Sequence, residues 1–186
     1  DLAADRLAEA VVAPLIARSR AATGRGNLAA EVPGLLRVNQ SKIDQINAVD
    51  EAITIGSVKY EFSTNQYGDV IHPQGFQYLK KFCRYPMPEW TFEFPSGVVL
   101  RKRIYMEKAS NTVCIDYQLS GECESAVLDL VPLVTCRSYH NESYANSGST
   151  PKRQGSADSC EFELTADLHL KLFCPGAEWR PSDCWY

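Results

Sequence analysis

The sequence predicts a mainly β protein, an antiparallel sandwich of two sheets that is preceded by an N-terminal α-helix. Three observations support this class. After about residue 32 the hydrophobic pattern changes from a helical period to a period of two. Short strand-like runs recur at roughly 8 to 14 residues with turn chemistry between them, and no helical stretch intervenes. Alternating strands and helices would be needed for a parallel sheet, so an antiparallel all-β fold follows. A chain of 186 residues can bury one good core.

The first element is predicted to be an amphipathic helix over residues 1–22. Its apolar residues fall near one face, with acidic residues early and arginines late, which suits the helix dipole. Pro14 is expected to kink this helix or to end its first half. Gly24 and Gly26 indicate a linker. We therefore divide the chain into residues 1–31, the helix and linker, and residues 32–186, the β-sandwich domain.

The strands follow in chain order, separated by turn residues. They are predicted over residues 35–38, 42–46, 52–55, 58–62, 77–83, 90–94, 98–106, 113–119, 126–134, 161–165 and 169–174. Gly56 and Ser57 form a two-residue hairpin signal between two of them. Residues 113–119 alternate between an apolar and a polar face, which indicates a one-sided core. Residues 141–159 are polar, contain glycine and proline, and are predicted to form a mobile loop.

The charge and hydropathy exclude several classes of partner. The formal net charge of −4 argues against a nucleic acid or an anionic membrane. No apolar run approaches the roughly 18 to 20 residues that a membrane helix needs. Acidic residues interrupt the most apolar N-terminal segment, which excludes a signal peptide there, and the missing initiator Met suggests a processed chain or a fragment. The basic residues at 80–84 and 101–103 would alternate faces on strands, so we interpret them as solvated edges.

The cysteines indicate the compartment. Seven are present, an odd number, and none forms a C-x-x-C pair. This pattern favours reduced, mostly buried thiols in a cytoplasmic protein. A bridge between Cys160 and Cys174 stays open as the alternative for an exported chain.

Catalytic and metal-binding motifs are not found in the sequence. It contains no nucleophile elbow, no zinc-protease motif and no phosphate-binding glycine loop. The three histidines stand far apart, so neither a metal nor a cofactor is predicted. A glycosidase needs two carboxylates across a sugar bond, for which Glu89 with Asp69, or Asp129, would be the places to look. Because a solvated strand face explains most carboxylates, we predict no catalytic residue.

Two stretches have the composition of a recognition surface. Residues 60–82 join two strand-like runs and carry Asn65, Tyr67 and His72 among their amides and rings. Amide, guanidinium and aromatic groups are what sugar recognition uses, because sugar hydroxyls take forked hydrogen bonds and rings stack on the apolar sugar faces. The alternative is that turn-forming residues and capping rings simply close the end of a sandwich.

The second stretch directly follows the apolar strand over residues 126–134. Arg137, Tyr139 and His140 combine a guanidinium, a phenol and an imidazole within a few residues. They are predicted to line a sugar-binding cleft. The alternative is a polar corner that holds the end of the strand.

Several ordered segments resemble a known family. YEFSTNQY and HPQGFQYLKKF in residues 60–82 resemble the most distinctive run of the N-terminal domain of bacterial and archaeal glycogen debranching enzymes, the amylo-α-1,6-glucosidase family. PEWTF, LRKRIYM and TVCIDYQL follow in the same order, and LVPLVTCRSYHNES is similar to a further family segment with Ser138 where aspartate is usual. PGAEWRPSDCWY resembles the last segment. The resemblance covers roughly residues 41–186, whereas residues 1–40 have no counterpart of the family's opening motifs.

This resemblance implies a sandwich of the super-sandwich type that packs against an (α/α)6 barrel. In the family, the barrel carries the acid and base that hydrolyse the α-1,6 branches of glycogen or maltodextrin. The implied function of this chain is an accessory, incomplete β-domain that shapes the glucan cleft of a glycoside hydrolase. A sandwich cut short would expose strand edges, so self-association is expected.

The implied partners are an α-glucan and the catalytic barrel of the same protein. Arg137, Tyr139 and His140, together with Asn65 and Tyr67, would contact the glucan, and so would His72. Two alternatives remain open: a 4-α-glucanotransferase activity within this domain, and a stand-alone carbohydrate-binding sandwich without an attached enzyme.

Overall fold

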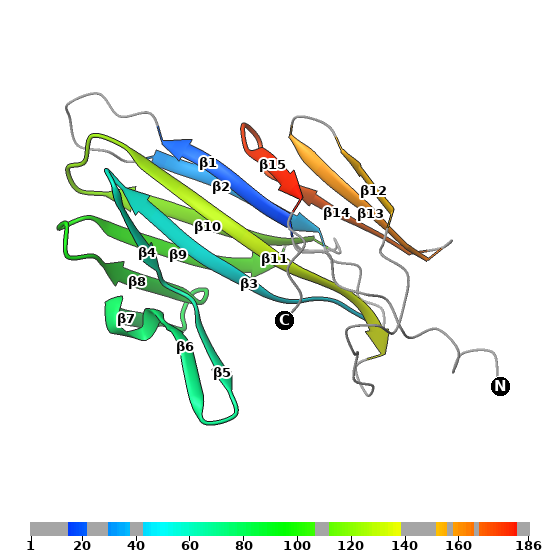
Figure 1. Cartoon of the computed structure of the whole chain (residues 1–186), viewed down its shortest axis with the longest axis horizontal. Coiled ribbons are helices and arrows are strands. Elements are labelled where there is room, and N and C mark those ends of the chain that lie inside the picture. The colour runs from blue at the N-terminus through cyan, green and yellow to red at the C-terminus, as the bar shows by residue number, and fades with distance from the viewer. Residues whose placement is uncertain are drawn as a thin grey trace.

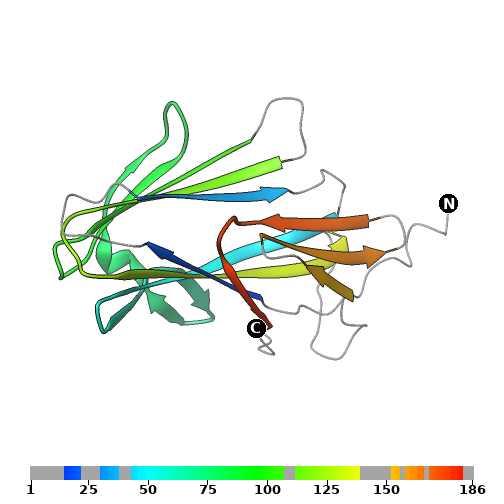
Figure 2. The ribbon, with the colours of Figure 1, turned by 90° about the horizontal axis from the view of Figure 1, so that it is seen from above.

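A computed structural model describes the chain over residues 15–21, 30–37, 43–106, 112–138, 152–155, 158–165 and 168–181. Side chains are described for residues 48–106, 112–133, 158–163 and 169–180. The described residues form two antiparallel sheets and one separate hairpin (Figure 1). Figure 2, turned by 90°, shows the sheets as two layers. The predicted class, a mainly β antiparallel fold, is confirmed.

The first sheet has five strands in the order β15-β1-β11-β3-β4. Their bounds are Glu178–Pro181 for β15, Leu15–Ala21 for β1, Ala126–Ser138 for β11, Ile43–Ile55 for β3 and Val58–Glu61 for β4. Every pairing in it is antiparallel. The turn between β3 and β4 confirms the predicted hairpin, because Ile55 pairs with Val58 and Gly56 adopts a φ of 59°. Such a left-handed turn conformation favours glycine.

The second sheet has eight strands in the order β12-β13-β14-β2-β10-β9-β8-β7. Their bounds are Lys152–Gly155 for β12, Ser159–Thr165 for β13, Leu168–Phe173 for β14, Ala30–Arg37 for β2, Thr112–Ser120 for β10, Val99–Met106 for β9, Glu89–Glu93 for β8 and Leu79–Cys83 for β7. Strand β7 forms one edge of this sheet, and its Lys80 and Lys81 are exposed there as predicted.

A short excursion connects the two sheets. After β4 the chain forms the hairpin of β5 (Thr64–Tyr67) and β6 (Val70–Gln74), then the 3-10 helix η2 (Gly75–Tyr78), and enters the eight-stranded sheet at β7. We call residues 64–78 the arm. In Figure 1 its hairpin extends beyond both sheets. The polar and aromatic stretch 60–82 is therefore the crossing from one layer of the sandwich to the other.

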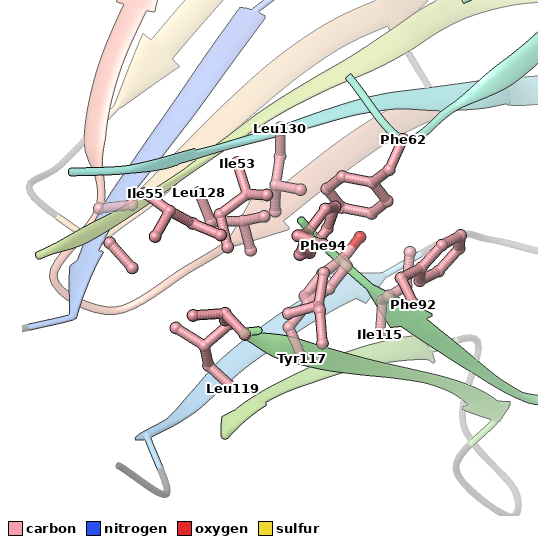
Figure 3. Close-up of a cluster of buried hydrophobic side chains, with 14 of the residues drawn as sticks. Ile53, Ile55, Phe62, Phe92, Phe94, Ile115, Tyr117, Leu119, Leu128 and Leu130 are labelled. Carbon is pink, nitrogen blue, oxygen red and sulfur yellow. The ribbon is translucent and has the colours of Figure 1, made fainter. Parts of the chain in front are cut away.

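The main core lies between the two sheets. Figure 3 shows Ile53 and Leu128 of the five-stranded sheet pointing toward Tyr117 and Leu119 of the eight-stranded sheet. Full burial of one such side chain stabilises the fold by about 1.5–3 kcal/mol. Ile115, Tyr117 and Leu119 are buried in this cluster, as predicted for the apolar face of the strand, whereas Val113 is only half-buried and Cys114 on the opposite face is buried as well. A smaller cluster adds to the core; it consists of Cys160, Phe162, Leu170 and Leu172.

Two predicted elements need correction. The helix expected over residues 1–22 is not confirmed, because Leu15–Ala21 form β1, and residues 1–14 lie outside the described part. Strand β1 pairs with β11 on one side and, over Leu15–Arg18, with β15 on the other, so sheet pairing satisfies backbone groups on both of its edges there. This tertiary pairing outweighs the weak helical period. The loop expected over 141–159 likewise contains β12, which pairs with β13. The domain boundary between residues 31 and 32 stays a prediction.

The described cysteines are free thiols. They are Cys83, Cys114, Cys123, Cys160 and Cys174, whose side chains are described. The alternative Cys160–Cys174 bridge is not formed, since the register of β13 and β14 places Cys160 opposite Leu172. The described residues contain no helix with the length and apolar character needed to cross a membrane.

Candidate functional site: the arm and its anchor

The arm is attached to the five-stranded sheet at two consecutive residues of β3. The Phe62 amide donates a hydrogen bond to the Glu51 carbonyl at 3.0 Å, and the Glu51 amide donates to Ser63 Oγ at 2.6 Å. One residue earlier, Asp50 Oδ1 accepts a hydrogen bond from Asn65 Nδ2 at 2.7 Å. Because burial, partial for the Asn65–Asp50 bond, limits the competition from water, these contacts fix the direction in which the hairpin leaves the sandwich.

The other end of the hairpin closes on the same point. The Gly75 amide donates to the Ser63 carbonyl at 2.9 Å. A Cβ atom on Gly75 would lie 2.1 Å from the carbonyl carbon and oxygen of Phe62, and 2.4 Å from the Ser63 carbonyl oxygen. No side chain tolerates such distances to backbone atoms. Glycine is therefore required here by the close approach of two backbone segments.

Aromatic rings fill the side of the sandwich where the chain crosses. The rings of Tyr60 and Tyr78 meet edge to face with centroids 5.7 Å apart, and Phe94 lies 5.2 Å from Tyr60 and 5.3 Å from Tyr78. Phe62 packs 5.1 Å from Phe92. Each such pair contributes about 0.5–1.5 kcal/mol beyond the area that it buries. Strand β4, the helix η2 and strand β8 are thus joined by rings.

Large apolar side chains are exposed along the arm and in the residues directly after it. Ten large apolar side chains are exposed in the described part of the chain, and seven of these lie between residues 67 and 85. They are Tyr67, Val70, Ile71 and Phe76 of the arm, and Leu79, Phe82 and Tyr85 directly after it, and together we call them the apolar arm surface. Exposed apolar residues that gather in one region mark interaction sites more often than isolated ones do.

A buried ion pair lies directly behind the anchor of the arm. The Glu51 side chain is 5% exposed and its Oε1 lies 2.7 Å from Lys102 Nζ, whose side chain is 15% exposed. The same oxygen accepts a hydrogen bond from the Tyr117 hydroxyl. Burial and, second, the neighbouring Glu51 carboxylate raise the pKa of Tyr117 well above its ordinary value. Lys102 Nζ also lies 5.6 Å from the centre of the Trp90 ring.

This ion pair was missed by the sequence reasoning. Residues 101–103 were predicted to lie on a solvated edge, and Lys102 instead faces inward in β9, a strand inside the sheet. The available signal was its position between Leu100 and Ile104, both of which contribute to the core. In a strand of period two, a lysine at an inward position needs a buried partner.

The outward face of the eight-stranded sheet carries paired charges. Arg101 lies 3.5 Å from Glu89 and donates to Gln118 at 3.1 Å, and Arg103 lies 3.5 Å from Asp116. These half-exposed pairs contribute little stability, about 0–1 kcal/mol each. The carboxylate of Glu89 therefore has a structural explanation as part of a salt-bridged sheet face.

Comparison with known proteins identifies the family. The sequence matches the family described as glycogen debranching enzyme N terminal over residues 34–186. The chain belongs to this family. No curated protein and no solved structure matches it. Within this glycogen debranching enzyme N-terminal domain, the matched region includes the arm and its anchor on β3. Strand β1 precedes the matched region, yet it pairs within the five-stranded sheet.

Three of the predicted site residues lie together on the arm of this debranching-enzyme domain. Asn65 is half-buried, and its amide is bonded to Asp50, so it positions the hairpin. Tyr67 is 44% exposed at the end of β5, and His72 is exposed in β6. The hairpin register places Tyr67 opposite Val70. Tyr67 and His72 are therefore accessible to a ligand or to a second protein body.

The other predicted residues lie elsewhere. The backbone of Arg137 pairs with Asp44 in β3, whereas the arm is anchored at Asp50. Six residues of a strand span about 20 Å, so the two predicted surfaces are well separated along β3. The Arg137 side chain, and Tyr139 and His140 altogether, lie outside the described residues.

The carboxylates considered for catalysis belong to different parts of the domain. Glu89 belongs to the outward face of the eight-stranded sheet, where it pairs with Arg101. Asp129 alternates in β11 with Leu128 and Leu130, which point into the core, so it belongs to the outward face of the opposite sheet. Asp69 lies in the turn of the hairpin. Among the described residues, no group of three or more metal-ligating side chains is found.

Proposed function

We propose that this chain is an accessory domain that shapes the glucan cleft of an (α/α)6 catalytic domain in the same protein. That protein would be a cytoplasmic glycogen debranching enzyme, an amylo-α-1,6-glucosidase that hydrolyses the branches of glycogen or maltodextrin. Membership of the family supports the class of enzyme. The apolar arm surface is the observation that carries the role proposed for this domain.

The aliphatic members of the apolar arm surface favour a protein body as their contact. Val70 is 61% and Ile71 is 42% exposed, and branched aliphatic side chains pack against other apolar side chains. They give a sugar neither a hydrogen bond nor a flat ring. Burying this surface against the catalytic domain would remove an exposed apolar patch that a soluble protein otherwise avoids. The arm is thus proposed as the part of this domain that meets the barrel.

Glucan contact is proposed for Tyr67, an aromatic member of that surface, and for the polar His72 on the same hairpin. Tyr67 and His72 offer a ring and a hydrogen-bonding imidazole on the hairpin. Arg137, Tyr139 and His140 remain proposed as a second glucan contact, from the residue types alone. Asn65 holds the hairpin in place through Asp50.

The catalytic alternative has less support. A 4-α-glucanotransferase within this domain would need two carboxylates facing one pocket. Glu89 and Asp129 belong to outward faces of opposite sheets, and Glu89 is paired with Arg101. The acid and base are therefore proposed to reside in the catalytic domain.

The proposal can be tested in two steps. First, the chain alone is incubated with maltoheptaose and with a branched dextrin, and the products are analysed; neither hydrolysis nor transfer is expected. Second, the same chain is added to, or fused with, the catalytic domain encoded with it, and branch hydrolysis is expected to rise. Glucose release or chain transfer by the domain alone would overturn the accessory role. Tight dextrin binding without any effect on hydrolysis would support a stand-alone carbohydrate-binding sandwich instead.

A further inference from the structure

We propose that Glu51 and Lys102 are positioning residues for the arm. Their ion pair would fix the arm relative to the eight-stranded sheet, in addition to any part it has in holding the two sheets together. Both side chains are largely buried, whereas Tyr67 and His72 are exposed on the hairpin, so the pair would act through the backbone and the packing between them.

Glu51 joins the arm to the opposite sheet through two different parts of the residue. Its backbone amide and carbonyl hold Ser63 and Phe62, the last residues before the arm begins. Its side chain is held by Lys102 and Tyr117 of the eight-stranded sheet. A shift of the Glu51 carboxylate would therefore move the Glu51 backbone, to which the arm is hydrogen-bonded.

Lys102 is connected to the other end of the crossing through two aromatic rings. Its ammonium lies 5.6 Å from the Trp90 ring, and Trp90 packs on Phe82 with centroids 5.0 Å apart. Phe82 lies in β7, the strand that receives the chain from the arm. The row formed by Phe82, Trp90 and Lys102 crosses three neighbouring strands in register. The ion pair is thus linked to the entry of the arm through the Glu51 backbone and to its exit through the Trp90 ring.

The energetics favour a role in positioning. Removing two charges from water is costly, and replacing a buried ion pair with apolar residues of similar volume is often neutral or even stabilising. Stability alone would therefore not require this pair. A charged pair with a hydroxyl donor prescribes direction and distance, which an apolar contact at the same place would leave open. The consequence of this positioning for the catalytic domain rests on the proposed function, whereas the test below does not.

The experiment measures amide hydrogen exchange in the whole chain. Lys102→Met removes the cation and keeps the length of the side chain. Arg103→Met is the matched control, since Arg103 is the next residue of β9, faces outward and forms a half-exposed pair with Asp116. We expect residues 62–78 to exchange at least about tenfold faster in Lys102→Met, relative to the amides of β10, and to remain unchanged in Arg103→Met.

A second variant separates positioning from general stability. Glu51→Gln combined with Lys102→Met leaves no buried charge, so the core is expected to regain its protection. If the pair positions the arm, residues 62–78 still exchange at least about tenfold faster than in the unmodified chain. The proposal is wrong if the amides of the arm regain protection together with those of β10 in the double variant. It is also wrong if the arm and β10 lose protection to the same extent in both variants, because the pair then supports only the fold as a whole. The double variant also decides the matter if Lys102→Met fails to fold.

Discussion

Glu51 and Lys102 face each other across the interior of the sandwich, with 2.7 Å between the carboxylate oxygen and the ammonium nitrogen. They come from different sheets, β3 and β9. Their contact lies directly behind the point where the arm is anchored. A charged pair at this depth is sensitive to the loss of either partner, because the remaining charge would be buried alone.

Loss of one partner is therefore expected to destabilise the domain strongly. Lys102→Met should lower the free energy of unfolding by about 3–5 kcal/mol, as breaking a buried pair does. The control is Lys59→Met, whose pair with Glu61 is about half exposed at 55% and 47%. That change should stay within about 0.5 kcal/mol. Urea unfolding followed by tryptophan fluorescence measures both, and equal effects of the two variants would contradict the assignment.

A side chain at position 75 is expected to disturb the base of the arm. Gly75→Ala places a Cβ atom 2.1 Å from the backbone of Phe62, so one of the two segments must move. A loss of about 1–3 kcal/mol is expected from such overpacking. Gly68→Ala serves as the control for the place of the effect, because its Cβ meets nothing within 4 Å and the strain from its φ of 58° arises in the turn of the hairpin. Hydrogen exchange should show faster opening at residues 62–64 for Gly75→Ala and not for Gly68→Ala.

The raised pKa of Tyr117 predicts a loss of stability in alkali. The phenol has an ordinary pKa of 10.0 when the chain is unfolded, and burial together with the Glu51 carboxylate raises its pKa in the folded state. Between these two values only the unfolded chain releases the proton, so stability falls as pH rises above 10 and is fully present below it.

The size of this effect follows from the single proton involved. The free energy of unfolding should fall by about 1.4 kcal/mol per pH unit between the two pKa values. Tyr117→Phe should remove this part of the slope. Urea titrations at several pH values from 9 upward, about one pH unit apart, compare the two proteins. Parallel curves would show that Tyr117 does not contribute.

The apolar arm surface is expected to matter for association and not for folding. Val70→Ser should leave the unfolding free energy within about 0.5 kcal/mol, because Val70 is 61% exposed. It should also weaken binding to the catalytic domain, or self-association where that domain is absent. Val58→Ser is the matched control, at 50% exposure but outside the arm. Size-exclusion chromatography and a binding titration measure both effects. Equal weakening by both variants would place the contact elsewhere.

Glucan contact by the hairpin is tested separately. Tyr67→Ala and His72→Ala are expected to lower kcat/KM for branched dextrin in the protein that contains the catalytic domain, by about tenfold if one stacking or hydrogen-bonding contact is lost. Asn65→Ala should act differently. It removes the bond to Asp50, so its effect should appear in the hydrogen exchange of the arm as well. Unchanged kinetics in all three variants would remove the hairpin from the glucan cleft.

Much of the fold follows from local patterns. The turn at Gly56 and Ser57 was predictable because a two-residue hairpin needs a left-handed conformation that glycine adopts without strain. The alternation of Ile115, Tyr117 and Leu119 was predictable because one face of the strand is buried. The predictions that failed concern segments whose state depends on distant partners, such as Leu15–Ala21 and Lys152–Gly155.

By itself, the sequence determined the all-β class, the strands with one-sided alternation and the family. These depend on side-chain chemistry within a few neighbouring residues. Only the tertiary structure decided that β1 is a strand, that residues 60–82 cross between the sheets, and that Lys102 faces inward to Glu51. The physical reason is that sheet pairing and charge burial are satisfied by residues far apart in the chain, here 51 residues apart for the ion pair, which no local period encodes.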